Sequence, residues 1–191
     1  ILAASGQVKS AARAGLEFAG ELSLTGELRP VRGALAMALG SGRSGRAFVL
    51  PEENAAQATL AARATVLPAR SLLEVCAHLA GEALLVPRRN GARPASAACA
   101  DFREVKGQTA AKRALEVAAA GGHSVLLLGP PGTGKSMLAA RLPGILAPMS
   151  EAEALESAAI QSASSAGFDP AHWGARPYRA PHHTASRVAL A

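Results

Sequence analysis

The amino-acid sequence predicts an α/β fold: a partial α+β domain followed by the beginning of a second domain. Of its 191 residues 49% are hydrophobic and only 3% are aromatic, so the core must be built from Ala, Leu and Val. That composition suits helices packed on a sheet better than an all-β sandwich, whose strands favour aromatic residues. Short strand patterns alternate with helix patterns, and an apolar run, a glycine-rich loop and a helix follow one another over 124–142.

The first part, residues 1–86, begins with a β-rich pattern. Residues 18–24 and 27–31 are expected to form a hairpin around a tight turn at Thr25 and Gly26. The elements predicted after it are a short helix (33–39), a strand (47–50) stopped by Pro51, a helix (53–62), an extended segment (64–67) and a helix (71–80).

The last of these helices has the clearest boundaries. Ser71 with Glu74 forms a capping box, and Gly81 is a helix terminator. Residues 87–100 then combine Pro, Gly and Arg without periodic apolar spacing, which indicates an exposed linker. The predicted organisation is therefore a domain over 1–86, a linker over 87–100 and a second domain over 101–191.

The second domain is expected to open with a helix over 108–120. Residues 124–128 are a continuous apolar run between turn signals, as a buried parallel strand requires. A helix over 135–142 follows, and a second capping box, Ser150 with Glu153, predicts one more helix from residue 151.

The loop between the apolar run and the next helix fits G-x-x-x-x-G-K-[ST] at every defined position. Its glycines allow a tight turn that presents backbone N–H groups to phosphate oxygens, beside the positive end of the helix. Lys135 can reach the β- and γ-phosphates, and the Ser136 hydroxyl is a ligand for magnesium. We therefore expect ATP and Mg²⁺ as cofactors. The predicted nucleotide-binding residues are Gly129, Pro130, Pro131, Gly132, Thr133, Gly134, Lys135, Ser136 and Met137.

Efficient hydrolysis needs a further acidic group, usually at the end of another apolar strand. The acidic residues after Ser136 are Glu151, Glu153 and Glu156, in a polar helix pattern, and Asp169, in a Gly/Pro loop. None of them follows an apolar strand. We expect this stretch of chain to bind ATP with little hydrolysis and to contain no catalytic residue.

Three segments carry a family resemblance: DFREVKGQ at 101–108, GGHSVLLLGPPGTGKSMLA around the loop, and RAPHHTAS at 179–186. Together they resemble the Mg-chelatase-like AAA+ ATPases of the YifB/ComM type. The resemblance implies an adenine pocket bordered by Val105, Gly107 and Gln108, a cytoplasmic ring-shaped homo-oligomer and an ATP-driven DNA motor. The family's Walker B acid, sensor residues and arginine finger have no position here, so the chain, which starts with Ile, is expected to be an internal fragment.

The first domain is similar to the C-terminal part of a Lon-protease-like domain, through GELSLTGELRPVRG and AFVLPEENAAQA. In that family a catalytic lysine follows shortly after the glycine matched by Gly33. Here the residues are Ala34, Leu35, Ala36 and Met37, and an apolar side chain cannot activate a serine. The resemblance therefore implies a structural or assembly domain rather than a protease.

Several interpretations stay open at the level of sequence. The net charge of +6 is compatible with a DNA partner or with arginines spread over solvated faces. His182 and His183 are expected to contact a neighbouring subunit or DNA in preference to a metal, and the alternative is a solvent-exposed loop. Cys76 and Cys99 are expected to be reduced, and no apolar run is long enough to span a membrane.

Three classes of function remain: a DNA motor, the energy-coupling subunit of a metal chelatase, and a nucleotide module that only binds. The Lon-like part ahead of the glycine-rich loop favours the first class.

Overall fold

A computed structural model describes residues 2–8, 13–89 and 99–181. The chain folds into two compact units: the first comprises Ile1–Ser96 and Glu151–Trp173, and the second comprises Ala97–Ser150 and Gly174–Ala191. The predicted fold class is confirmed: the chain is mixed α/β and contains a parallel sheet. The chain passes from the first unit to the second after Ser96 and returns to the first unit over 151–173, and the division into domains over 1–86 and 101–191 stays a prediction.

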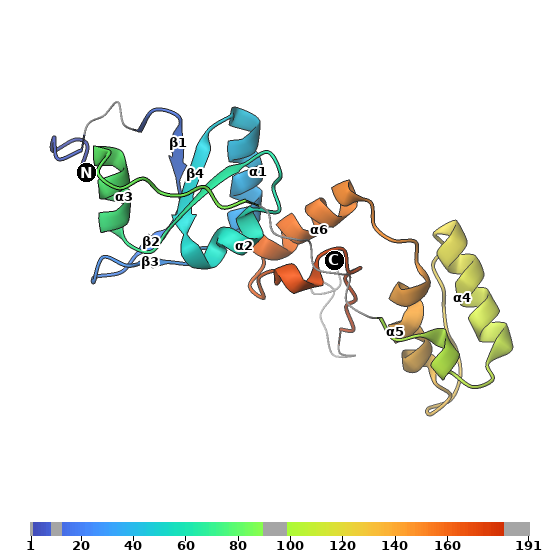
Figure 1. Cartoon of the computed structure of the whole chain (residues 1–191). Helices are drawn as coiled ribbons and strands as arrows, with labels where there is room; N and C mark the ends of the chain where they lie inside the picture. The colour runs from blue at the N-terminus through green and yellow to red at the C-terminus, as the bar shows by residue number, and fades with distance from the viewer. Residues whose placement is uncertain (1, 9–12, 90–98, 182–191) are drawn as a thin grey trace. The chain divides into compact units, whose positions relative to one another are not determined.

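The sheet of the first unit has three parallel strands in the order β1-β4-β5 (Figure 1). These are β1 (Leu16–Phe18), β4 (Ala47–Pro51) and β5 (Thr65–Ala69). Central strand β4 is almost entirely buried, as its apolar sequence AFVLP requires. The sheet therefore forms the middle of this unit's core.

The predicted hairpin is present in a shorter form, as β2 (Glu21–Leu22) antiparallel to β3 (Leu28–Arg29). Its turn contains Gly26, at a φ of 86° that favours glycine. The expectation that residue 18 begins this hairpin was wrong. Phe18 ends β1 instead, because its backbone pairs with Val49 in the parallel sheet.

The helices of the first unit cover the sheet. Helix α1 (Ala34–Ser44) extends beyond the predicted 33–39, and Gly45 ends it in the left-handed conformation. The helix expected over 53–62 is shorter: a 3₁₀ turn, η2 (Glu52–Asn54), followed by α2 (Ala55–Ala58). Leu35, Leu50 and Val66, from α1, β4 and β5, are completely buried and join these layers in one core.

Helix α3 (Leu72–Ala80) has the predicted boundaries. The Ser71 hydroxyl accepts a hydrogen bond from the Glu74 N–H, and Gly81 closes the helix with a φ of 79°. The Glu74 carboxylate accepts from the Arg70 N–H at 2.7 Å, one residue earlier than a standard capping box. Local polar signals thus fix both ends of this helix.

Helix α6 (Glu151–Ala163) packs against α1 within the first unit. Buried Ser162 makes the contact: its carbonyl accepts from the Gly33 N–H at 2.8 Å, and its hydroxyl oxygen lies 3.5 Å from the Leu35 N–H donor nitrogen. The same hydroxyl donates to the Gln57 side chain, whose amide donates to the Phe168 carbonyl. A 3₁₀ turn, η4 (Pro170–His172), completes this segment.

The second unit contains a 3₁₀ turn, η3 (Phe102–Glu104), and helices α4 (Thr109–Gly121) and α5 (Lys135–Ile145) (Figure 1). Its small core is formed by Val105, Leu115 and Leu138. Both helices agree with the sequence prediction, although α5 continues through Pro143 to Ile145.

The buried parallel strand predicted over 124–128 was wrong. No strand is assigned there, and Leu126 and Leu128 are 80% and 83% exposed. A strand needs a hydrogen-bonded neighbour, and all the strands found in the described residues belong to the first unit. The apolar sequence is present, but the described residues of this unit, 99–150 and 174–181, supply no partner strand to bury it.

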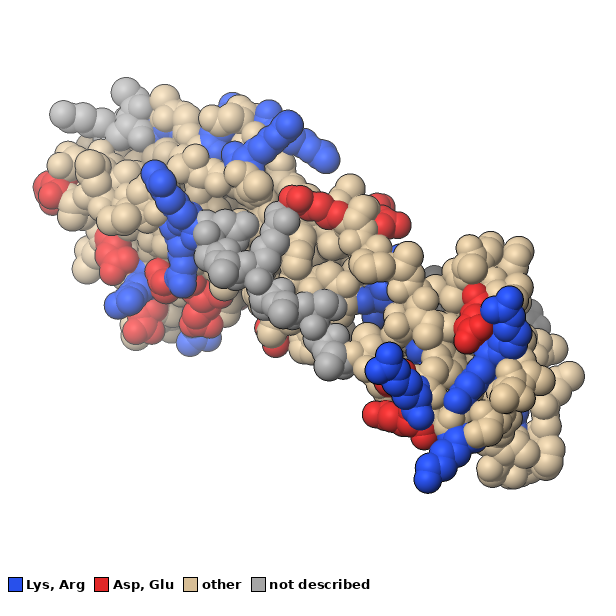
Figure 2. Space-filling view, turned by 45° about the vertical axis from the view of Figure 1, so that its right-hand side comes forward, with Lys and Arg blue, Asp and Glu red and all other residues tan. Residues whose placement is uncertain are grey.

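Basic and acidic side chains are interspersed on the face of the molecule that Figure 2 shows. Cys76 and Cys99 are not joined to each other by a disulfide in the described part of the chain. Of the helices that the structure describes, none has the length and apolar character needed to cross a bilayer.

Candidate nucleotide-binding site

The glycine-rich loop leads directly into the first turn of α5, which begins at Lys135. Gly132 and Gly134 have φ values of 82° and 83°, a region that strains any residue with a Cβ atom. The first N–H groups of a helix have no partner within the helix and carry partial positive charge. The glycines therefore let the chain turn sharply and present these amides to an anion.

Lys135 folds back over the loop that precedes it. Its ammonium group donates to the carbonyls of Gly129 and Pro130, at 2.8 and 2.7 Å, and lies 3.3 Å from the Thr133 hydroxyl. Thr133 in turn donates to the Pro130 carbonyl at 2.9 Å. The ammonium group of Lys135 is thus held against the loop by carbonyl groups, and phosphate oxygens can replace these as hydrogen-bond acceptors.

Ser136 and Met137 lie on the exposed side of the first turn of α5. The Ser136 hydroxyl is one residue from Lys135, which is where a ligand for phosphate-bound magnesium is needed. The combination of a left-handed glycine loop, a helix N-terminus, one ammonium group and one exposed hydroxyl fits a magnesium triphosphate. The residues predicted for the phosphate side are therefore brought together.

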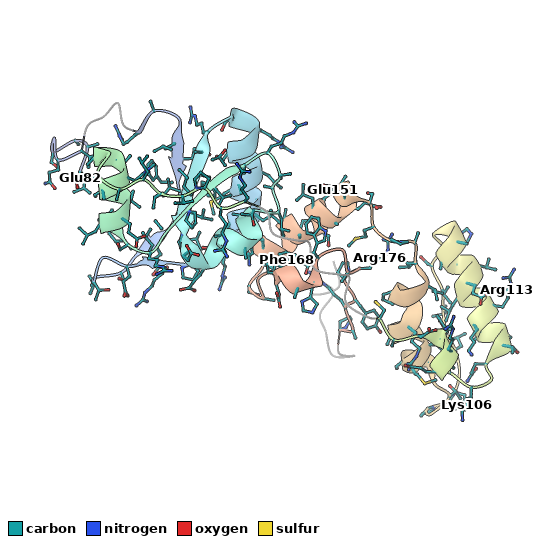
Figure 3. The ribbon with its side chains drawn as sticks, in the orientation of Figure 1. Glu82, Lys106, Arg113, Glu151, Phe168 and Arg176 are labelled. Atoms are coloured by element: carbon teal, nitrogen blue, oxygen red, sulfur yellow. The ribbon has the colours of Figure 1, made fainter. Side chains whose placement is uncertain are left out.

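The segment before α4, which the sequence assigned to the adenine side, is divided between core and surface. Val105 is 2% exposed and packs with Leu115 and Leu138. Gly107 and Gln108 are exposed and lie next to each other in left-handed backbone. Figure 3 shows Lys106, between Val105 and Gly107, at the end of the unit where this segment turns into α4.

Two basic residues that the sequence analysis did not single out hold this segment in place. The Arg141 guanidinium donates to the Asp101 carbonyl at 3.1 Å and forms an ion pair with Glu104 at 2.5 Å. The Lys112 ammonium donates to the Val105 carbonyl. Neither Arg141 nor Lys112 belongs to a motif. The only sequence signal for their role in holding this segment is that each lies in a predicted helix near an acidic, Gly-containing segment.

The acidic residues of the second unit all precede the loop, and each has a structural partner. Asp101 accepts from the Arg103 N–H at 2.9 Å, Glu104 pairs with Arg141, and Glu116 pairs with Arg113 at 3.1 Å. The acids that follow the loop lie in Glu151–Trp173, which belongs to the first unit.

Asp169 is one of those acids, and its carboxylate caps η4 by accepting from the Ala171 N–H at 2.9 Å. It also lies 3.6 Å from the His172 ring. Its position is thus explained by local structure in the first unit.

The RAPHHTAS segment is described only in part. Arg176 donates to the Ala147 carbonyl at 2.8 Å, within the second unit. Arg179 is exposed, and His182, His183 and the residues after them lie outside the described part. Within the part that is described, no three His, Cys, Asp or Glu side chains are grouped as a metal site would require.

Comparison with known proteins gives consistent matches along the chain. The family profile described as "Magnesium chelatase, subunit ChlI" matches residues 101–191, and the one described as "Subunit ChlI of Mg-chelatase" matches residues 1–54. The whole chain is 47% identical to the uncharacterized protein YifB of Salmonella typhimurium and 40% identical to the competence protein ComM of Haemophilus influenzae. It is 43% identical to YifB of Escherichia coli. In each case it spans 38% of the relative's length.

Proposed function

The chain belongs to the Mg-chelatase-like proteins of the YifB/ComM type, and from that premise we propose that its second unit binds ATP with Mg²⁺. The observation that carries the proposal is the loop at the start of α5, where two left-handed glycines precede Lys135. In the bound state the ammonium group exchanges its loop carbonyls for phosphate oxygens, and Ser136 takes part in holding magnesium. The metal ion would offset phosphate charge at this position.

The direct test is calorimetric titration of the chain with ATP and magnesium. Lys135→Ala removes the one positive charge inside the loop, and a charge-assisted contact of this kind is worth about 1.5–3 kcal/mol, or roughly 10- to 150-fold in affinity. Arg113→Ala is the matched control, because Arg113 is an exposed cation on α4 that points away from the loop (Figure 3). Equal affinities of the wild type and Lys135→Ala would reject the assignment.

For the whole protein we propose a cytoplasmic, ring-forming, ATP-driven DNA motor with a role in recombination or uptake of DNA. Three features support it: a relative named as a competence protein, a net charge of +6, and a Lon-like part placed before the ATP-binding part. Arg176 and Arg179 add two cations in the segment after residue 173. Arginine contacts to phosphate grip DNA without reading its sequence, which suits a translocating motor.

The second candidate is the energy-coupling subunit of a metal chelatase, which the wording of both matching family descriptions favours. The ATPase rate of the full-length protein, with and without branched or single-stranded DNA across a salt series, separates the two. A DNA motor is stimulated by DNA, and the stimulation declines as salt rises because counterion release weakens binding. Absence of both stimulation and DNA binding at low salt would favour the chelatase.

A further inference from the structure

Gln108 combines an unusual backbone with a long-range side-chain contact. Among the residues that the structure describes, it is the non-glycine residue with a positive φ, 56°, directly after Gly107 at 67°. Side chains rarely adopt this conformation, and such residues persist where surrounding contacts over-determine them. The contact that does so here crosses 25 positions of sequence: the Gln108 side-chain amide donates to the Thr133 carbonyl at 2.9 Å.

The left-handed turn at Gln108 directs its side chain to the loop while its backbone starts α4. The Gln108 carbonyl accepts from the Lys112 N–H at 2.9 Å, the first bond of that helix. On the loop side, a Cβ atom placed on Gly134 would lie 3.9 Å from the Gln108 amide nitrogen, so the amide occupies the space next to Gly134 that a side chain there would enter. Gln108 thus connects a helix start with the loop.

The connection has a directional consequence at the peptide bond between Thr133 and Gly134. In a planar trans peptide the C=O and the following N–H point in opposite directions. A Thr133 carbonyl held toward Gln108 therefore directs the Gly134 N–H to the opposite side. That N–H belongs to the row of amides that precedes α5 and that the glycine-rich loop offers to phosphate.

We propose that Gln108 is a positioning residue for the phosphate loop: its side-chain amide fixes the Thr133–Gly134 peptide so that the Gly134 N–H is presented to the triphosphate. This inference rests on the proposed ATP-binding function and deepens it. This role differs from adenine recognition, because the Gln108 side chain contacts the phosphate loop and needs no contact with the base. The connection holds the loop in its binding shape before the ligand arrives.

The test compares the wild-type chain with Gln108→Ala and Gln108→Gly, titrated with the magnesium complexes of ATP, GTP and inorganic triphosphate. Gln108→Ala removes the amide and keeps the strained backbone, whereas Gln108→Gly removes both, which guards against simple misfolding. Gln161→Ala is the matched control: it removes a glutamine whose amide donates to Ser157 at 3.1 Å in the first unit.

We expect both Gln108 variants to bind all three ligands about two- to tenfold more weakly, the range for one lost hydrogen bond, with an unchanged ratio of ATP to GTP affinity. Gln161→Ala should bind as the wild type does. Loss of ATP affinity with undiminished inorganic triphosphate affinity would overturn the proposal, because it would make Gln108 a reader of the base. Unchanged affinity for all ligands would overturn it as well.

A second measurement separates this inference from the ATP-binding proposal. Hydrogen exchange of the nucleotide-free chain reports on the loop whether or not a ligand binds. We expect the hydrogen-bonded amides that flank this connection, Lys112 at the start of α4 and Leu138 after the loop, to exchange faster in Gln108→Ala than in the wild type, and Gln161→Ala to leave both unchanged. Faster exchange in a chain that binds no ATP would refute the binding function and keep the connection. Equal exchange in the wild type and Gln108→Ala would refute the connection.

Discussion

The two units differ in how completely they bury their apolar sequence. In the first unit β4 lies between β1 and β5, and Leu50 is fully buried. In the second unit no strand of the described residues lies beside the apolar run before the glycine-rich loop, and Leu126 is 80% exposed. Both runs have the composition of a buried strand. Composition therefore makes a strand possible, and a neighbouring strand decides whether it forms.

The glycine-rich loop of the second unit, unlike the apolar run before it, has the local structure that its sequence predicts. The glycine-rich loop keeps its left-handed glycines and its Lys135 contacts although the preceding run is exposed. These features depend on the local backbone and on the helix that follows. A binding loop can thus be specified by a few adjacent residues, whereas a hydrophobic core requires the assembly of distant ones.

The largest expected effect tests this difference with one substitution made twice. Leu50→Ala should cost about 2–5 kcal/mol in the first unit, because it leaves a cavity in a closed core. Leu126→Ala should change stability by less than about 0.5 kcal/mol, because that side chain is already in solvent. Urea unfolding followed by fluorescence of Trp173, the chain's only tryptophan, reports on the first unit, and hydrogen exchange in α4 reports on the second.

Leu115→Ala provides the positive control in the second unit, where Leu115 is 2% exposed. It should accelerate exchange in α4 although Leu126→Ala does not. Strong destabilisation by Leu126→Ala would mean that the run 124–128 is buried in solution. The two units would then not differ in how completely they bury their apolar sequence.

Sequence reasoning located the elements whose signals are local. Helix α3 has its ends at Ser71 and Gly81, as the capping pattern predicts, and α5 starts at the residue after the glycine-rich loop. The run 124–128 was misassigned because its apolar character says nothing about which strand lies next to it. The place of α6 was not anticipated either, since it depends on Ser162 meeting α1 more than a hundred residues away.

The candidate site was predictable on its phosphate side and less so around it. The motif at 129–136 identifies the binding residues directly from the sequence, because each defined position requires a particular backbone or chemical property. Arg141 and Lys112 carry no motif, and their contacts with the segment before α4 depend on how α4 and α5 pack. An adenine pocket bordered by Val105, Gly107 and Gln108 stays a prediction.

A smaller effect is expected at the attachment of α6 to the first unit. Ser162→Ala removes the hydroxyl that approaches the Leu35 N–H and donates to Gln57. The backbone contact with Gly33 remains, so the cost should be about 1 kcal/mol, seen as faster exchange in α6 and an earlier Trp173 transition. Ser157→Ala, on the same helix, is the control; if both variants behave alike, Ser162 does not hold α6 to this unit.

The smallest expected effect concerns turnover of ATP by this chain. We expect phosphate release to stay at background, because each carboxylate of the second unit already serves a structural partner and none of the acids after the loop follows an apolar strand.

Hydrolysis requires more than binding, since a carboxylate must orient water and support magnesium while the triphosphate is held. Lys135 and Ser136 supply contacts to the ground state, and such contacts alone do not lower the barrier of the chemical step. A phosphate-release assay at saturating ATP, with Lys135→Ala as the reference, decides the matter. Steady turnover that disappears in Lys135→Ala would show that a carboxylate of this chain reaches the loop, and Glu104 and Asp169 would then be the first candidates for substitution by the corresponding amides.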